Sequence, residues 1–202
     1  TPLERNRLGQ FATPTALALD ILQFANQLAP RSGVRFLDPA FGTGSFYSAL
    51  RAVFEKRQIK AAVGFEIDNH YWKPSSQLWK ETELSLQLTD FTAAQAPKSD
   101  PSKFNLVICN PPYVRHHHLE ASEKVRLQGC AEQATNVRLS GLAGLYCYFM
   151  LLSHEWMSKD GVAGWLIPSE FMDVNYGSAL KTYLLSNVTL LRIHRFDPND
   201  VQ

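Results

Sequence analysis

Short apolar runs that alternate with helical patterns constrain the fold of this 202-residue chain more than any other feature. The runs predict six strands, at residues 34–38, 61–66, 84–89, 104–109, 161–167 and 188–196. Apolar residues at helical spacing predict helices at residues 13–28, 45–56, 70–80, 145–156 and 176–185. This alternation indicates an α/β fold, a mostly parallel sheet with helices on both faces. In such a sheet, ligands bind at the carboxyl ends of the strands.

Composition narrows the class of protein. With 45% hydrophobic and 19% charged residues, the chain is expected to be globular, and its length suits one domain over residues 1–202. No apolar run is long enough to span a bilayer, which favours a cytoplasmic protein. The three cysteines lie at no metal-like spacing, so no metal site and no disulfide framework is expected. A net charge of +1 neither supports nor excludes nucleic acid as a partner.

A glycine turn follows the first predicted strand. Gly42 and Gly44 allow a tight turn and a close approach of a ligand to the backbone. Tyr47 stands where a dinucleotide fingerprint has its third glycine. Asp38, ahead of the turn, suits a cationic group such as the ammonium of a methionine moiety better than a pyrophosphate. A purely structural strand-to-helix turn is the alternative interpretation.

The next two strands also end in acidic residues. Glu66 lies 22 residues after Gly44, where an acid can accept both hydroxyls of a ribose. Asp90 and Phe91 follow the third strand, where a carboxylate can accept from an adenine amino group and a ring can stack on the base. Glu66 alone could be a surface residue. Together with the glycine turn they fit an adenosine without phosphates, and therefore S-adenosylmethionine.

The most specific motif is Asn110-Pro111-Pro112-Tyr113, after the fourth strand. Two prolines fix backbone angles and remove two N–H donors, which leaves rigid carbonyls. An exocyclic amine is a poor nucleophile because its lone pair is delocalised into the ring. The Asn110 side-chain oxygen and the Pro111 carbonyl can accept its two N–H groups, so that the lone pair points at a sulfonium methyl. Tyr113 offers a face for stacking.

At these residues the chain resembles the amino-methyltransferases, especially the N6-adenine DNA methyltransferases of restriction–modification systems. Gln10-Phe11-Ala12-Thr13-Pro14, upstream of the glycine turn, resembles the N-terminal cofactor motif of the gamma-type order in that family. The resemblance runs from about Gln10 to the C-terminus. It implies a Rossmann-like fold, S-adenosylmethionine as cofactor, and double-stranded DNA as partner in the bacterial cytoplasm. It also implies that Thr13 helps to hold the methionine end of the cofactor.

The resemblance implies two sets of site residues. The catalytic set is Asn110, Pro111, Pro112 and Tyr113, with Tyr113 stacking on an adenine flipped out of the duplex. The cofactor-binding set is Phe11, Thr13, Asp38, Ala40, Gly42, Gly44, Glu66, Asp90 and Phe91.

The chain departs from the family pattern near its C-terminus. Family members close the sheet with a further antiparallel strand, and gamma-type enzymes then carry a target-recognition domain. Only six residues follow the sixth predicted strand, so we expect a fragment of a longer polypeptide, with a specificity or restriction module on the same or another chain. Phe196 is the late candidate for a second aromatic that clamps the flipped base.

Several alternatives stay open on the sequence. The substrate could instead be a protein glutamine side chain or an RNA base, and the chain could be a non-enzymatic remnant of such an enzyme. His116, His117 and His118 favour a solvated loop, or at most a phosphate contact, over a metal site. Together with Arg115, Lys124, Arg126 and Arg138 they form either a DNA-facing loop or an ordinary mobile surface, diluted by Glu120, Glu123 and Glu132. Pro168-Ser169-Glu170-Phe171 either shapes the target pocket or is a plain turn.

Overall fold

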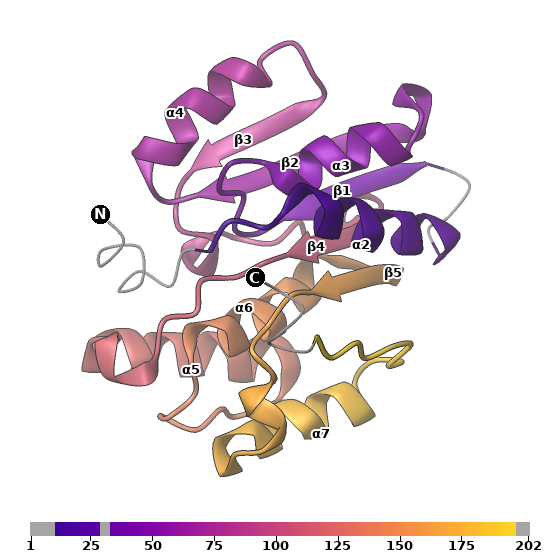
Figure 1. The fold of residues 1–202 in the computed structure, drawn as a ribbon. Coiled ribbons are helices and arrows are strands. Elements are labelled where there is room, and N and C mark those ends of the chain that lie inside the picture. The colour runs from indigo at the N-terminus through magenta and orange to yellow at the C-terminus, as the bar shows by residue number, and fades with distance from the viewer. Residues whose placement is uncertain (1–10, 29–32, 197–202) are drawn as a thin grey trace.

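One parallel sheet of five strands organises the computed structural model, which describes residues 11–28 and 33–196 (Figure 1). The strands are β1 (Val34–Asp38), β2 (Ile59–Glu66), β3 (Leu84–Leu88), β4 (Phe104–Cys109) and β5 (Met157–Trp165). They lie in the order β3-β2-β1-β4-β5, and every pairing is parallel. From β1 the chain adds β2 and β3 toward one edge, and then returns to place β4 and β5 on the other side of β1. Ligands are expected at the carboxyl ends of β1 and β4, where this direction changes.

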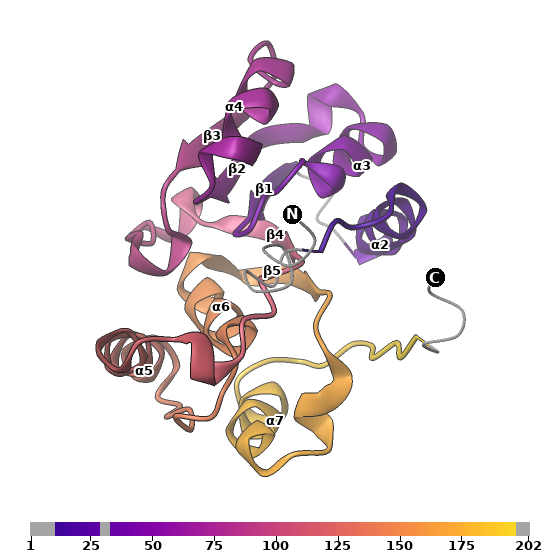
Figure 2. The same ribbon diagram turned by 60° about the vertical axis from the view of Figure 1, so that its left-hand side comes forward.

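Helices cover both faces of the sheet (Figures 1 and 2). One face carries α2 (Thr15–Leu28), α3 (Ser45–Val53) and α4 (Asn69–Leu78). The other carries α5 (Ala121–Thr135), α6 (Leu145–Ser153) and α7 (Ser178–Ser186). Successive strand residues point to opposite faces, so Leu106 packs in the core beneath α2 and α3, while Val107 packs in the core beneath α6. The predicted Rossmann-like architecture is confirmed.

The first helix differs from its prediction in start and orientation. It begins at Thr15, and the Pro14 carbonyl accepts its first hydrogen bond, from the Ala18 N–H at 3.0 Å. The buried side of α2 consists of Ala18, Leu22 and Ala25. The larger residues at helical spacing, from which the helix is predicted, are only partly buried or exposed: Leu17, Ile21, Phe24 and Leu28. Small residues on this side let α2 pack closely against α3.

The sixth predicted strand is wrong. Residues 188–196 have no regular secondary structure, and Leu190, Leu191 and Ile193 are exposed. In the described part of the chain the sheet ends at β5, so this apolar run has no strand beside it to supply hydrogen bonds or cover one face.

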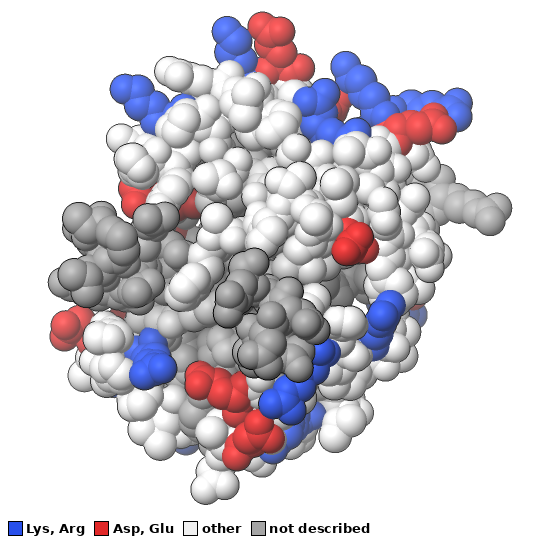
Figure 3. Space-filling model, viewed as in Figure 1, with Lys and Arg blue, Asp and Glu red and all other residues white. Residues whose placement is uncertain are grey.

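Residues 114–140 are partly helical. A short 3-10 turn at His116–His118 precedes the 15-residue helix α5. No helix in the described ranges is long and apolar enough to cross a membrane. Figure 3 shows acidic and basic side chains interspersed over one face of the molecule, with no extended area of a single sign.

Candidate active site at the strand ends

The glycine turn after β1 has the backbone geometry that its sequence predicts. Gly42 and Gly44 have φ angles of 55° and 83°, in the left-handed region that favours glycine. A Cβ on Gly44 would lie 2.8 Å from the Phe41 ring, whereas one on Gly42 would meet no atom within 4 Å. Gly44 is therefore required for close packing as well as for its φ angle. Gly42 is required for its φ angle only and faces open space.

Glu66, at the end of β2, fastens this turn to the sheet. One carboxylate oxygen accepts from the Gly42 N–H at 2.8 Å, and the other accepts from the Asp68 N–H at 2.7 Å. Burial raises the pKa of the Glu66 carboxyl, and the two backbone hydrogen bonds oppose that effect. Sequence reasoning missed this structural role. Each oxygen can accept a second hydrogen bond, so the ribose-binding role stays a prediction.

Asp38, at the end of β1, is fully buried and only partly satisfied. Its Oδ1 accepts from the Ala40 N–H at 3.2 Å, and its Oδ2 has no hydrogen-bond partner. Burial raises the pKa of Asp38 to about 8, the Ala40 N–H lowers it, and the nearby Glu66 raises it further. Burial also raises the pKa of the Cys109 thiol, and Asp38 adds to that effect. An orphaned carboxylate oxygen of this kind is a partner for a cation.

Asn110 is held by the segment that precedes α2. Its Nδ2 donates to the Phe11 carbonyl at 3.0 Å and to the Thr13 hydroxyl oxygen at 3.1 Å. A carbonyl can only accept, so this contact settles which end of the amide is the nitrogen. The Oδ1 atom is buried and has no partner. Two segments that are remote in sequence thus meet here. We call this place, formed by Phe11, Thr13 and Asn110, the Asn110 corner.

Two contacts hold the Tyr113 side chain in place. Its hydroxyl donates to the Leu166 carbonyl at 3.0 Å, and its ring lies 5.4 Å from the Phe11 ring, tilted by 31°. Burial raises the pKa of the phenol, which keeps the hydroxyl protonated as a donor. The ring is therefore fixed in orientation beside Asn110.

Asp90 and Phe91 lie in different environments at the end of β3. The Asp90 carboxylate accepts from the Thr92 N–H at 2.8 Å and from the Thr92 hydroxyl at 2.9 Å. The Phe91 ring is 2% exposed and packs in the core with Phe65 and Trp156. The prediction that this ring stacks on a base is therefore corrected, because almost none of the ring is accessible to a ligand.

Arg126, on α5, lies beside Asp90 and Thr92. The sequence predicts it only as part of a DNA-facing loop or a mobile surface. Its guanidinium donates to the Thr92 carbonyl at 2.8 Å and the Thr92 hydroxyl at 2.7 Å, pairs with Glu123, and lies 3.7 Å from Asp90 Oδ2. It thus braces the turn that carries Asp90. The spacing of Glu123 and Arg126 on a helix could have indicated their ion pair, but not the contact with Thr92.

A cavity of about 570 Å³ opens beside Tyr113. Its lining comes from Phe11, residues 113–118, Leu142, Gly144, Tyr146, Pro168 and Glu170. Pro168 and Glu170 therefore do contribute to a pocket next to the Asn110 corner. Asp38, Glu66 and Asp90 do not line this cavity; they lie at the ends of the three neighbouring strands.

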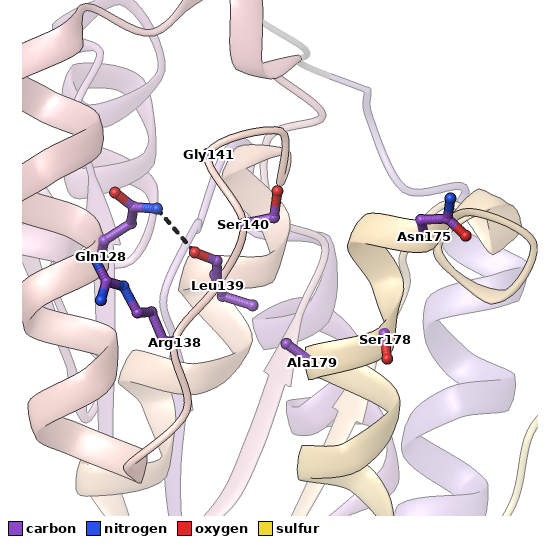
Figure 4. A pocket seen from close by; sticks show the side chains of 8 residues that line it. All are labelled: Gln128, Arg138, Leu139, Ser140, Gly141, Asn175, Ser178 and Ala179. Atoms are coloured by element: carbon purple, nitrogen blue, oxygen red, sulfur yellow. Dashed lines mark hydrogen bonds between the residues drawn. The ribbon is translucent and has the colours of Figure 1, made fainter.

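A second cavity of similar volume lies between α5 and the start of α7 (Figure 4). Gln128 and Arg138 lie on one side, and Asn175 and Ser178 on the other. Gln128 donates to the Leu139 carbonyl at 2.8 Å. None of the predicted site residues lines this cavity, so it is not part of the candidate site.

The chain is similar to known restriction–modification methyltransferases. The family model described as Eco57I restriction-modification methylase matches residues 15–201. Type II methyltransferase M.AccI of Acinetobacter calcoaceticus is 30% identical over 192 residues, which is 94% of this chain and 33% of that protein. Type II methyltransferase M.XamI of Xanthomonas campestris pv. amaranthicola is 29% identical over 206 residues, 95% of this chain and 36% of that protein. The chain therefore spans about a third of the length of the curated relatives it matches.

A solved structure supports the fold assignment. A protein of Listeria monocytogenes, assigned to the class I S-adenosylmethionine-dependent methyltransferases, aligns with a TM-score of 0.68 at 15% identity, over 88% of this chain and 53% of that one. At this identity the likeness shows a shared fold. The match of the family model over nearly the whole chain shows more: the chain belongs to the Eco57I restriction-modification methylase family.

Proposed function

We propose that this chain, as a single catalytic domain, binds S-adenosylmethionine and supports methyl transfer to the N6 amino group of an adenine extruded from double-stranded DNA. The activity belongs to a restriction–modification system. Family membership and the names of the type II relatives support the DNA methyltransferase class. The adenine target rests on the Asn110 corner.

The orientation of the Asn110 amide carries this proposal. Its nitrogen is engaged by Phe11 and Thr13, so its oxygen is the end that remains for a ligand, and that oxygen is buried without a partner. An unsatisfied buried acceptor costs about 1–3 kcal/mol, which an incoming N–H donor recovers. An amine bound there, with the Pro111 carbonyl as second acceptor, has its lone pair free for attack. When S-adenosylmethionine is bound, its methyl group would pass to this nitrogen as the carbon–sulfur bond breaks, and the amine would lose one proton to solvent.

Residues at the neighbouring strand ends are those that would hold the cofactor. The unpartnered Oδ2 of Asp38 fits the ammonium of the methionine moiety, and Gly42 faces open space as a close ligand approach requires. Glu66 and Asp90 would accept from the ribose and the adenine. S-adenosylmethionine supplies the sulfonium methyl when bound. Thr13 would contribute at the methionine end while its hydroxyl holds Asn110.

The test is methylation by the full-length protein with labelled S-adenosylmethionine and duplex DNA, followed by digestion to nucleosides. We expect label in N6-methyladenosine. Label in another base, or transfer only to an RNA or a glutamine-containing protein offered in parallel, would contradict the proposal.

Two substitutions separate the roles of the amide. Asn110→Ala removes the acceptor and should reduce kcat at least 100-fold while S-adenosylmethionine still binds, since it removes positioning and electrostatic stabilisation in the transition state. Asn110→Asp keeps an oxygen but loses the donor to Phe11 and Thr13, and should retain partial activity. Wild-type turnover in Asn110→Ala would show that the amide has no catalytic part.

A further inference from the structure

The turn that follows Tyr113 gathers basic groups at the cavity beside it. Arg115, His116, His117 and His118 all line that cavity. Arg115, His117 and His118 are exposed, and the rings of His117 and His118 lie 4.1 Å apart. These side chains lie close to the corner where an extruded base is proposed to bind.

The electrostatics of His117 show that these groups act on one another. The pKa of His117 is lowered by desolvation first, and then by His118, His116, Arg115 and Lys124. No acidic group is among these causes. Its positive neighbours therefore oppose protonation of His117.

The acidic residues that dilute this charge in the sequence are arranged differently in space. Glu123 is paired with Arg126, so the charges of these two residues largely cancel each other. Glu120 lies exposed at the start of α5, and Glu170 lines the same cavity as the histidines. Arg115 and Lys124 are the charged residues, besides the other histidines, that lower the pKa of His117.

We propose that residues 115–118, together with Lys124, bind a backbone phosphate of the DNA beside the extruded nucleotide. The inference rests on the proposed function, because an extruded base brings its flanking phosphates to the mouth of the pocket. Guanidinium, ammonium and imidazolium groups donate hydrogen bonds to phosphate oxygens. A metal ion is a poorer occupant, since the described residues contain no group of three or more histidine, cysteine, aspartate or glutamate side chains that could hold one.

This site makes DNA binding dependent on pH. A phosphate beside the turn raises the pKa of the His117 imidazole above that of the free protein, so binding takes up a proton. Affinity is then greatest at low pH and falls as the pH rises through the raised pKa of the complex. Besides the other two histidines, the charged groups that act on His117 are Arg115 and Lys124, and Tyr113, Tyr146 and Glu170 line the same cavity.

The test measures binding of fluorescent duplex DNA to the full-length protein by anisotropy, between pH 5.5 and 8 and at several salt concentrations. Replacing both His117 and His118 with Gln keeps polar side chains but removes their titration. We expect a several-fold weaker affinity at pH 6, loss of most of the pH dependence, and a salt slope smaller by about 0.9 for each phosphate that the variant no longer neutralises. Arg138→Gln, on the cavity between α5 and α7, is the matched control and should leave all three unchanged.

Wild-type affinity, pH dependence and salt slope in the double variant would overturn the inference. It would also be overturned if the variant lost affinity for single-stranded RNA but none for DNA. The readout needs no methyl transfer, so it can be repeated on Asn110→Ala protein. Failure of the proposed function, seen as absence of N6-methyladenosine, is thereby separated from failure of the phosphate site.

Discussion

At the scale of single residues, the candidate site is characterised by polar atoms that the fold buries without satisfying. Asp38 Oδ2 and Asn110 Oδ1 are two such atoms, at the ends of the adjacent strands β1 and β4. A fold gains no stability from orphaned acceptors, since each costs free energy relative to water. Their position at the switch point of the sheet therefore favours a role in ligand binding: one acceptor for a cation, the other for an amine.

Asp38 yields a prediction on proton release. With a pKa of about 8 in the free protein, its carboxyl is mostly protonated at pH 7. An ammonium bound beside it stabilises the ionised form and lowers the pKa, so cofactor binding at pH 6.5–7 should release up to one proton, and affinity should rise with pH towards about 8. Calorimetry of S-adenosylmethionine binding in two buffers of different ionisation enthalpy measures this release. At pH 7 and below the amino group of the ligand stays largely charged.

Asp38→Asn is the control for that measurement. It keeps the shape of the side chain and cannot titrate, so proton release should fall to near zero and the affinity should weaken. Equal proton release in Asp38→Asn and wild type would assign the proton to another group.

At the scale of elements, the apolar pattern predicts secondary structure well wherever the sheet covers it. β1 and β4 match their predicted bounds, because fully buried parallel strands have nearly continuous apolar sequences. The run at residues 188–196 has a similar composition but lacks a neighbouring strand, which no local pattern reveals. Local sequence also could not predict two contacts at the end of β3. The Phe91 ring lies in the core and Arg126 reaches Thr92, and both depend on how α5 and α6 pack against this end of the strand.

The hydrogen bonds from Arg126 on α5 to Thr92 after β3 lead to a second prediction. Arg126→Met keeps the aliphatic stem but removes the hydrogen bonds to Thr92, so the turn that carries Asp90 should loosen. We expect a loss of about 1–3 kcal/mol in the free energy of unfolding and a several-fold weaker affinity for S-adenosylmethionine. Chemical denaturation and calorimetry measure the two effects.

Arg57→Met is the matched control. Arg57 also pairs with a carboxylate, that of Glu55 at 2.6 Å, but both side chains are largely exposed. An exposed pair contributes about 0–1 kcal/mol and lies away from Asp90. Unchanged cofactor affinity in Arg126→Met would mean that Asp90 does not depend on this brace.

At the scale of the whole molecule, two hydrophobic cores lie on opposite faces of the sheet, and residues 190–193 expose apolar side chains outside both. Leu191 and Ile193 are 59% and 58% exposed, and β5 is an edge strand of the described sheet. Exposed apolar segments and open sheet edges promote association between chains. The 202-residue chain should therefore self-associate as its concentration rises.

The double substitution Leu191→Lys and Ile193→Lys tests this expectation. Neither side chain is packed in a core, so the free energy of unfolding should change by less than about 0.5 kcal/mol per substitution. Light scattering after size-exclusion chromatography should show a lower mean mass at high concentration, because two charges now oppose contact. Leu78→Lys, at a similarly exposed position at the end of α4, should leave the association unchanged. If Leu78→Lys reduced the mean mass as much as the double substitution, general surface charge rather than this segment would control association.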